Sequence, residues 1–210
     1  MDKILEKIPE AKKNVLLKDY TTYKIGGPAR YFFVAKTKED LVKALKTAEN
    51  FKLPVFVLGG GSNLLVSDKG FSGLVIKMDI FDIKINSSNA FVGAGVDLTK
   101  LAYLSADAGL SGLEWAAGVP GTVGGAIYGN AQAFGTKISD AVESVEAINL
   151  KTLELKNFTK KQCQFSLKNS VFKKTKNWVI VSAVLKFKKG DPQEIKNKMT
   201  EFVDYRKTKH

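Results

Sequence analysis

The residues best suited to chemistry in this chain lie in two glycine-rich stretches. The first reads Gly59-Gly60-Gly61-Ser62-Asn63 and directly follows the apolar run from Pro54 to Leu58. Consecutive main-chain amides in such a loop can fold into a nest that binds an anion, and the two polar side chains add donors for phosphate oxygens. The alternative is a plain flexible turn, although turns seldom place three successive glycines between two apolar runs. We therefore expect a phosphate-binding loop here.

The second stretch, Trp115 to Phe134, contains five glycines, one proline and no charged residue. Its central part combines a turn with a helix start of little side-chain bulk, in Pro120, Gly121, Thr122, Val123, Gly124, Gly125 and Ala126. We expect the first amides of that helix to be bare, so that they and the positive dipole end attract an anion. Small residues also let a flat ring lie close to the main chain. The alternative, a buried packed turn, would be preferred if this stretch stood alone.

Together the two stretches suit a ligand with a pyrophosphate and a flat ring, and FAD meets both demands. The common nucleotide fingerprints are absent. The chain has no Gly-x-x-x-x-Gly-Lys-Ser/Thr motif, and neither Gly59-x-Gly61 nor Gly93-x-Gly95 continues to a third glycine. With one cysteine, Cys163, and one histidine, His210, no Cys/His zinc site can form, and we expect no metal.

Charge is distributed unevenly along the chain. The 210 residues carry a formal net charge of +12, and residues 151–210 alone hold 16 Lys and Arg against five Asp and Glu. A basic region can bind nucleic acid or an acidic ligand. A solvated lysine surface is the simpler interpretation because few arginines are interleaved. We expect no specific nucleic acid partner, and solvent-facing side chains at Lys186, Lys188, Lys196 and Lys198.

Targeting and membrane signals are missing from the sequence. The N-terminus mixes charged and apolar residues and has no signal-peptide core. The longest uncharged run is the second glycine-rich stretch, whose glycines and proline argue against a membrane helix. The sequence therefore predicts a cytoplasmic protein with no membrane contact.

The elements that must position the two stretches do not alternate regularly, which predicts an α+β fold. Apolar spacing and caps predict helices over residues 2–12, 38–50, 98–108 and 192–210, with Thr37, Asp97 and Asp191 as N-caps. Apolar runs predict strands over residues 30–35, 54–58, 74–78, 81–86, 90–96, 144–150 and 178–188.

Several segments resemble one known family in order and spacing. They read TTYKIGGPA, VLGGGSNLLVSDKGFSGLVI, VGAGV, GLSGLEWAAGVPGTVGGAIYGNA and CQFSLKNSVFK. The chain resembles the UDP-N-acetylenolpyruvoylglucosamine reductases. The resemblance implies a two-subdomain FAD-binding fold of the vanillyl-alcohol-oxidase/PCMH type. Its subdomains would span residues 1–70 and 71–190, with the PCMH-type region at about 25–190. Residues 191–210 would form a helix leading to a substrate domain absent from this sequence.

The resemblance also implies an activity and a site. In the family NADPH reduces FAD, and the flavin then passes hydride to the enolpyruvyl double bond of a UDP-sugar, giving UDP-N-acetylmuramate for peptidoglycan synthesis. By this resemblance Gly59 to Asn63 would cradle the pyrophosphate, Pro120 to Ala126 would lie along the flavin, and Arg206 would belong to the cofactor site.

Two departures from the family pattern bear on activity. The family's Tyr-Arg pair is replaced by Leu167-Lys168. Lys168, the catalytic candidate, keeps the charge but not the planar fork that grips a carboxylate in two places. The family's proton-donating serine and supporting glutamate have no counterpart in residues 1–210, so we expect little or no turnover from this chain. The alternatives are a non-catalytic FAD-binding module or a basic nucleic-acid-binding protein.

Overall fold

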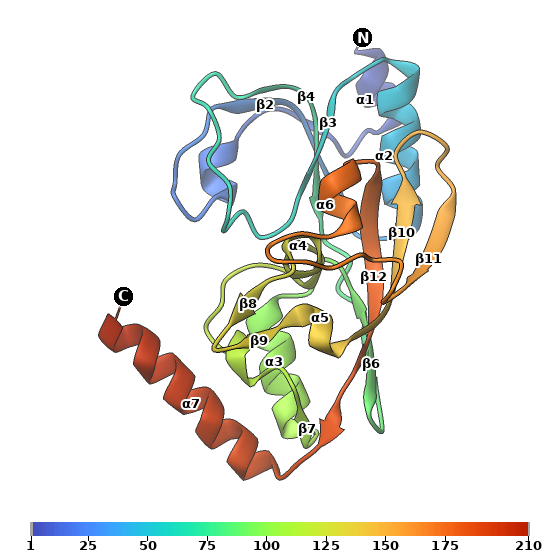
Figure 1. Ribbon diagram of the computed structural model, residues 1–210. Helices are drawn as coiled ribbons and strands as arrows, with labels where there is room; N and C mark the ends of the chain where they lie inside the picture. The colour runs from blue at the N-terminus through green and yellow to red at the C-terminus, as the bar shows by residue number, and fades with distance from the viewer. Residues whose placement is uncertain (1, 210) are drawn as a thin grey trace.

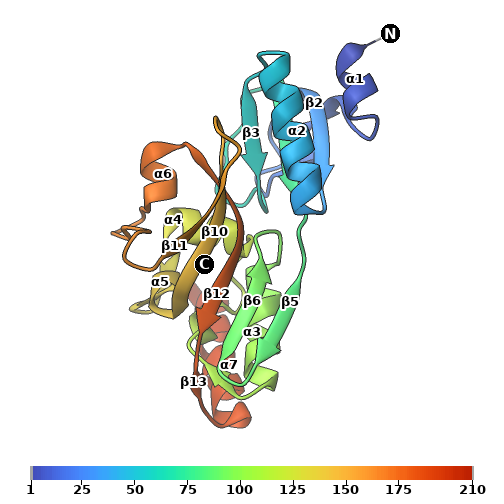
Figure 2. The ribbon, with the colours of Figure 1, turned by 90° about the vertical axis from the view of Figure 1, so that its right-hand side faces the viewer.

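The fold has two lobes, which follow one another along the long axis of the molecule, and each lobe is built on one β-sheet (Figures 1 and 2). The computed structural model describes residues 2–209. The first sheet mixes parallel and antiparallel pairs, whereas the second is antiparallel throughout. This irregular mixture of helices and strands confirms the predicted α+β class.

The first lobe occupies the upper part of Figure 1 and contains a four-stranded sheet in the order β1-β2-β4-β3. Its elements are α1 (Lys3–Lys7), β1 (Lys12–Leu16), the 3-10 helix η1 (Leu17–Tyr20), β2 (Pro28–Ala35), α2 (Lys38–Asn50), β3 (Val55–Leu58) and β4 (Phe71–Met78). The predicted cap of α2 is confirmed, because Thr37 Oγ1 accepts from Asp40 N and the Asp40 carboxylate accepts from Thr37 N.

The two faces of the first sheet pack differently. One face joins the main core beneath α2, where Leu41, Leu45 and Ala48 are buried (Figure 2). The other face forms a small separate cluster under η1 and the loop that follows β3, built from Leu17, Ala29, Phe32, Leu58 and Val75. The first glycine-rich stretch begins directly at the end of β3, beside this second cluster.

The second lobe contains a five-stranded sheet in the order β11-β10-β12-β6-β5. Its strands are β5 (Ile83–Asn86), β6 (Asn89–Gly93), β10 (Val142–Asn149), β11 (Leu155–Thr159) and β12 (Trp178–Lys186). Short strands form two separate pairs, β7 (Leu110–Ser111) with β13 (Lys188–Lys189) and β8 (Gln132–Ala133) with β9 (Thr136–Lys137). Its helices are α3 (Leu98–Asp107), η2 (Glu114–Ala116), α4 (Val123–Gly129), α5 (Ile138–Ala141), α6 (Val171–Thr175) and α7 (Pro192–Lys209).

Helix α7 lies along the outside of the second lobe and ends away from the body of the molecule (Figure 1). It packs on η2 and α3, with Ile195 and Met199 buried in its first half. Lys196 pairs with Asp107 of α3 at 2.7 Å, on the surface. Lys186, Lys188 and Lys198 are exposed, as expected for a solvated lysine surface.

Several element boundaries differ from the sequence-based expectation. The first helix ends at Lys7 rather than residue 12, because Pro9 disfavours a helical Ile8 and the chain turns into β1. Strand β11 was not predicted, since only one of its five residues is buried and no alternation is visible. Strand β4 follows the expected subdomain boundary at residue 70, yet it pairs within the first sheet, so the first lobe extends to Met78.

Candidate functional site

The two glycine-rich stretches meet at the junction of the lobes. A Cβ added to Gly60 would lie 2.8 Å from Gly121 Cα, and one added to Gly59 would lie 2.7 Å from Thr122 Oγ1. Ser62 Oγ donates a 3.0 Å hydrogen bond to the carbonyl oxygen of Pro120. The loop after β3 and the turn before α4 therefore form one continuous structure.

The first stretch leaves its amides unpaired. Within residues 2–209, the amides of Gly60, Gly61, Ser62 and Asn63 donate no hydrogen bond. The loop is nevertheless held in place, because Thr22 N donates to Gly61 O at 3.1 Å. Gly61 adopts a left-handed conformation, φ +68°, and a Cβ there would lie 1.9 Å from the carbonyl oxygen of Tyr20. Unpaired consecutive amides on an anchored loop suit an anion.

The second stretch contradicts the expectation of bare helix-start amides. Val123 N donates to Val96 O at 2.8 Å, and Gly124 N donates to Ala94 O at 2.9 Å. Gly125 N donates to the capping hydroxyl of Thr122 at 3.3 Å. The stretch runs antiparallel beside residues 94–98, which satisfies its amides, and α4 has only seven residues. The start of α4 is therefore not the anion site.

Gly125 differs from the other glycines of this motif. A Cβ on Gly124 would lie 2.8 Å from Ala94 Cβ, so packing within the protein requires glycine there. Gly125 is exposed, and the nearest atom to an added Cβ is Thr122 Oγ1 at 3.5 Å. Tyr128 is exposed one turn further along α4. This side of α4 is therefore open at Gly125, which leaves room for a ring system to lie against it.

A cation missed by the sequence analysis lies near the same loop. Lys77 is half-buried on β4, where it is paired in register with Leu58, the residue before Gly59. Burial lowers the pKa of Lys77, and the charge of Asp79 opposes that shift. No carboxylate among the described residues forms an ion pair with Lys77, whose Nζ donates only to Met78 O at 3.4 Å. The available signal was a lysine interrupting the apolar strand.

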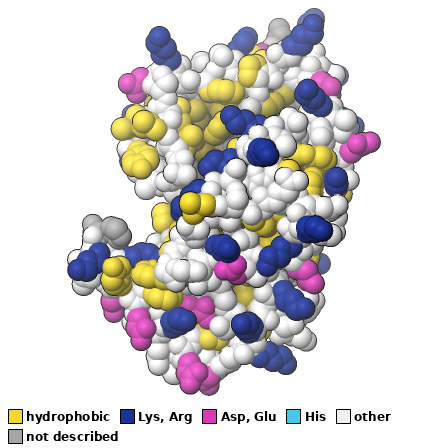
Figure 3. Space-filling view, in the orientation of Figure 1, with side chains coloured by type: hydrophobic (Ala, Val, Ile, Leu, Met, Phe, Trp, Pro, Cys, Tyr) yellow, Lys and Arg dark blue, Asp and Glu magenta, His cyan; other side chains and the backbone are white. Residues whose placement is uncertain are grey.

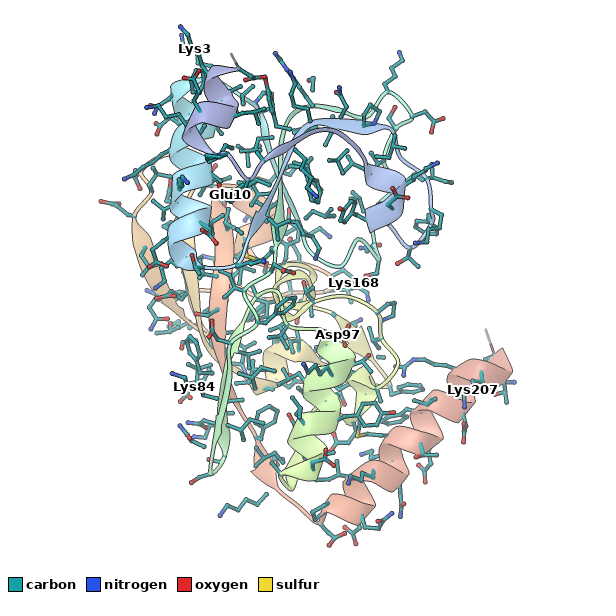
Figure 4. The ribbon with its side chains drawn as sticks, turned by 180° about the vertical axis from the view of Figure 1, so that it is seen from behind. Lys3, Glu10, Lys84, Asp97, Lys168 and Lys207 are labelled. Atoms are coloured by element: carbon teal, nitrogen blue, oxygen red, sulfur yellow. The ribbon has the colours of Figure 1, made fainter. Side chains whose placement is uncertain are left out.

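Lys168 lies at the tip of a short loop that is attached to α4. The tip is closed by the Ser166–Asn169 bridge and leaves both Leu167 and Lys168 exposed. Asn130, at the end of α4, donates to Ser166 O at 2.8 Å. Ser170 Oγ also donates to Tyr128 O at 2.7 Å. Figure 4 shows Lys168 at the opening between the lobes, on the side of the glycine-rich stretches.

Arg206, which was expected in the cofactor site, contacts the protein's own main chain. Its guanidinium donates to the carbonyl oxygens of Trp115, at 2.6 Å, and Ala117. The same group lies 4.9 Å from the ring centroid of Phe134. Burial lowers the pKa of Arg206 from its usual value. The side chain therefore joins α7 to the residues that lead into the second glycine-rich stretch.

The surface around these residues is hollowed. Figure 3 shows a notch between the first lobe and α7, with basic and hydrophobic side chains gathered at its inner edge. Large apolar side chains remain exposed in both lobes, among them Tyr23, Ile25, Leu65, Tyr128 and Leu167. Unpaired amides, an open helix face and exposed apolar side chains together fit a dinucleotide with a flat ring.

Other chemistries find little support in the described part of the chain. Residues 2–209 contain no group of three or more His, Cys, Asp and Glu side chains placed to hold a metal ion. Burial raises the pKa of the Cys163 thiol to about 12, so this group is not a nucleophile at neutral pH. None of the described helices combines the length and apolar character needed to cross a membrane.

The chain is similar in sequence to several known proteins. Residues 29–153 match the family described as "FAD binding domain". The chain is 37% identical to a UDP-N-acetylenolpyruvoylglucosamine reductase of Anoxybacillus flavithermus, over 99% of this chain and 70% of the relative. It is 40% identical to a reductase of the same name from Protochlamydia amoebophila, over 96% of this chain and 67% of the relative.

The chain is also similar to solved structures. A UDP-N-acetylenolpyruvylglucosamine reductase of Thermus caldophilus is 34% identical, with a TM-score of 0.80 over 93% of this chain and 69% of that chain. An alkyldihydroxyacetonephosphate synthase shares the fold at 13% identity, with a TM-score of 0.64 over 90% of this chain and 40% of that chain.

Proposed function

Because the chain belongs to the UDP-N-acetylenolpyruvoylglucosamine reductase family, whose members are FAD-dependent oxidoreductases of peptidoglycan synthesis, we propose that it holds FAD between its lobes. The substrate pair is NADPH and the enolpyruvyl ether of a UDP-sugar, and the product is UDP-N-acetylmuramate. The observation that carries this proposal is the contact between the two glycine-rich stretches, with unpaired amides beside an open helix face.

The pyrophosphate of FAD binds to the first stretch. Four successive unpaired amides, from Gly60 to Asn63, supply donors without side-chain bulk. The exposed Asn63 side chain adds a further donor. Lys77 supplies positive charge close to the end of β3, where neutralisation of a diphosphate is most favourable.

The ring system of FAD lies along the second stretch. Gly125 leaves the exposed face of α4 open, and Gly121 allows the preceding turn to approach closely. Gly59 and Thr122 shape this face indirectly, because they pack together across the junction of the lobes. Gly124 does so within the second lobe, where it lets α4 pack on Ala94. When bound, FAD would supply hydride-transfer chemistry at this position.

Lys168 is the proposed catalytic cation. Its loop is attached to the end of α4, which keeps the exposed Lys168 side chain within the same part of the second lobe as the open face of that helix. A fixed positive charge there stabilises negative charge that develops on the enolpyruvyl carboxylate during hydride addition. A lysine makes this contact as a point charge, without the bidentate geometry of an arginine.

The chain spans about 70% of the length of the relatives that it matches, and the proposal assigns FAD binding to residues 1–210. The family's serine and glutamate, which protonate and support the substrate, have no counterpart among these residues. We therefore propose that the 210-residue polypeptide, assayed alone, reduces the UDP-sugar slowly or not at all.

One spectroscopic experiment tests this proposal. The purified chain is incubated with FAD, separated from free flavin and examined for visible absorption, and then NADPH is added anaerobically with and without the UDP-sugar. Retained flavin that is bleached by NADPH supports the proposal. A colourless protein contradicts FAD binding, and retained flavin that NADPH never reduces supports a non-catalytic FAD-binding module instead.

A further inference from the structure

The main chain leading into the second glycine-rich stretch is held by side chains from distant elements. Residues 115–120 form no regular strand, and the 3-10 helix η2 covers only their first two positions. Two of their carbonyl oxygens accept hydrogen bonds from Arg206, near the end of α7. Arg206 lies 91 positions from Trp115, so this contact joins two segments of the second lobe that are far apart in the sequence.

Thr99 of α3 contacts two further carbonyls of the same run. Its Oγ1 lies 3.0 Å from Val119 O and 3.3 Å from Ala116 O. A hydroxyl has one hydrogen to donate, so the two carbonyls share it. Thr99 lies in the first turn of α3, after the N-cap Asp97, which gives the side chain a rigid base.

Ser62 holds the last carbonyl of the run, that of Pro120, at 3.0 Å. Side chains from three separate segments therefore contact five of the six carbonyls in residues 115–120, those of residues 115–117, 119 and 120. The remaining residue, Gly118, has a left-handed φ of +76°, and a Cβ added to it would lie 3.6 Å from Val203 of α7. Two main-chain hydrogen bonds also shape this run, from Val119 N to Ala116 O and from Leu98 N to Gly121 O, each 3.0 Å long. The side-chain contacts add to these bonds in fixing a turn that contains two positive-φ glycines, whose own conformational freedom is large.

We propose that Thr99 and Arg206 are positioning residues that hold the Gly118–Gly121 turn in the conformation required for flavin binding. This inference rests on the proposed function, since it concerns the same site. Neither side chain needs to touch the ligand. Each acts through the main chain of the turn, which continues into Gly125 and is joined to the phosphate loop by Ser62.

The contacts of Arg206 also couple the site to α7. The buried residues of α7, Ile195 and Met199, lie in its first half, and Phe202 and Val203 are only partly buried. Arg206 is therefore the main polar attachment of the last turns. Because Arg206 joins the turn to the last turns of α7, a ligand that stabilises the turn also stabilises the docking of this end of the helix. Coupling free energy is reciprocal, so docking of the helix end favours ligand binding by the same amount.

Two substitutions at Thr99 test the positioning role. Thr99→Val removes the hydroxyl and keeps the shape of the side chain, whereas Thr99→Ser keeps the hydroxyl. We expect Thr99→Val to weaken FAD binding about tenfold in calorimetry and to shift the absorption bands of bound flavin, with Thr99→Ser restoring both. The matched control is Thr200→Val, because Thr200 donates only to Lys196 O on the exposed side of α7.

Hydrogen exchange tests the coupling to α7. We expect FAD to slow amide exchange over residues 202–209 in the wild-type chain, and we expect Arg206→Lys to remove most of that effect. The inference is wrong, and the proposed function stands, if the wild-type chain binds flavin and Thr99→Val binds it with the same affinity and the same absorption bands. The same holds if amide exchange over residues 202–209 of the wild-type chain is equal with and without FAD. No flavin binding by the wild-type chain would overturn the proposed function, and this inference with it.

Discussion

Gly60 packs its Cα against the main chain of Gly121, so closely that a Cβ on Gly60 would lie 2.8 Å from Gly121 Cα. Replacing Gly60 with alanine must push the two stretches apart, since neither side of this contact is a flexible side-chain end. We expect Gly60→Ala to lower the free energy of unfolding by ~1–3 kcal/mol, as overpacking does elsewhere. Denaturant unfolding measures the loss, and a stability equal to that of the wild type would contradict the contact.

Gly125→Leu tests whether the flavin lies against α4, because it adds a bulky side chain on the exposed face of the helix without disturbing the packing of the protein. Gly125 is exposed in a helix, where leucine is intrinsically favoured by up to ~1 kcal/mol over glycine. We expect the variant to unfold at the same or a higher denaturant concentration than the wild type, yet to bind FAD at least tenfold more weakly. Unchanged FAD affinity would show that the open face of α4 does not contact the flavin.

The sequence predicted those features that depend on nearby residues. The helix at 38–50 was predicted from Thr37 and Asp40, which lie next to it and form its capping box. The α3 helix was predicted in the same way, from Asp97. The two glycine-rich stretches could be singled out because runs of glycine are visible without knowledge of the fold, and the structure brings them into contact.

The remaining features depend on main-chain partners that a sequence does not reveal. The amides of Val123 and Gly124 were expected to be bare, but they donate to carbonyls of residues 94–96, whose position is set by the tertiary fold. Arg206 was expected at the cofactor, yet its donors meet carbonyl oxygens, which any residue type can supply. Thr99 gave no signal for the same reason.

Asn130 connects the Lys168 loop to α4, and its loss should release that loop. Its side chain donates to Ser166 O and accepts from Ser139 N, and it holds a left-handed conformation of φ 45°. We expect Asn130→Ala to lower the free energy of unfolding by ~1–3 kcal/mol, because the buried Ser139 amide loses its acceptor and the Lys168 loop loses a hydrogen bond to the end of α4. Trypsin should also cleave after Lys168 faster.

The matched control for this variant is Asn157→Ala. Asn157 is exposed on the edge strand β11, and we expect its replacement to change neither unfolding nor cleavage. If Asn130→Ala and Asn157→Ala behave alike in both measurements, the loop is not held by Asn130.

Lys77→Met should stabilise the protein while weakening FAD binding. Burial lowers the pKa of Lys77 in the folded state, so the unfolded chain binds protons more readily at this position. The charged Lys77 therefore lowers the free energy of unfolding. This loss is fully present below the lowered pKa of the folded state, and it disappears as the pH rises through the pKa of the unfolded chain, 10.5. The gain in stability from Lys77→Met should therefore be larger at pH 7 than near pH 10.5.

Urea unfolding at the two pH values measures this gain, with the exposed Lys186→Met as the control that shows none. In the same variants, FAD affinity should fall only for Lys77→Met, because the charge near the phosphate loop is lost. A gain that grows with pH, or an unchanged FAD affinity, would contradict the role given to Lys77.

The central claim is that two glycine-rich stretches together hold a dinucleotide, and calorimetry with FAD and FMN tests it most directly. FMN has the flavin ring but lacks both the pyrophosphate and the adenine nucleotide half that the first stretch and the first lobe would contact. We predict that the 210-residue chain binds FAD at least about tenfold more tightly than FMN, a difference of ~1.4 kcal/mol or more. Equal affinity for the two flavins, or no binding of either, would contradict the claim.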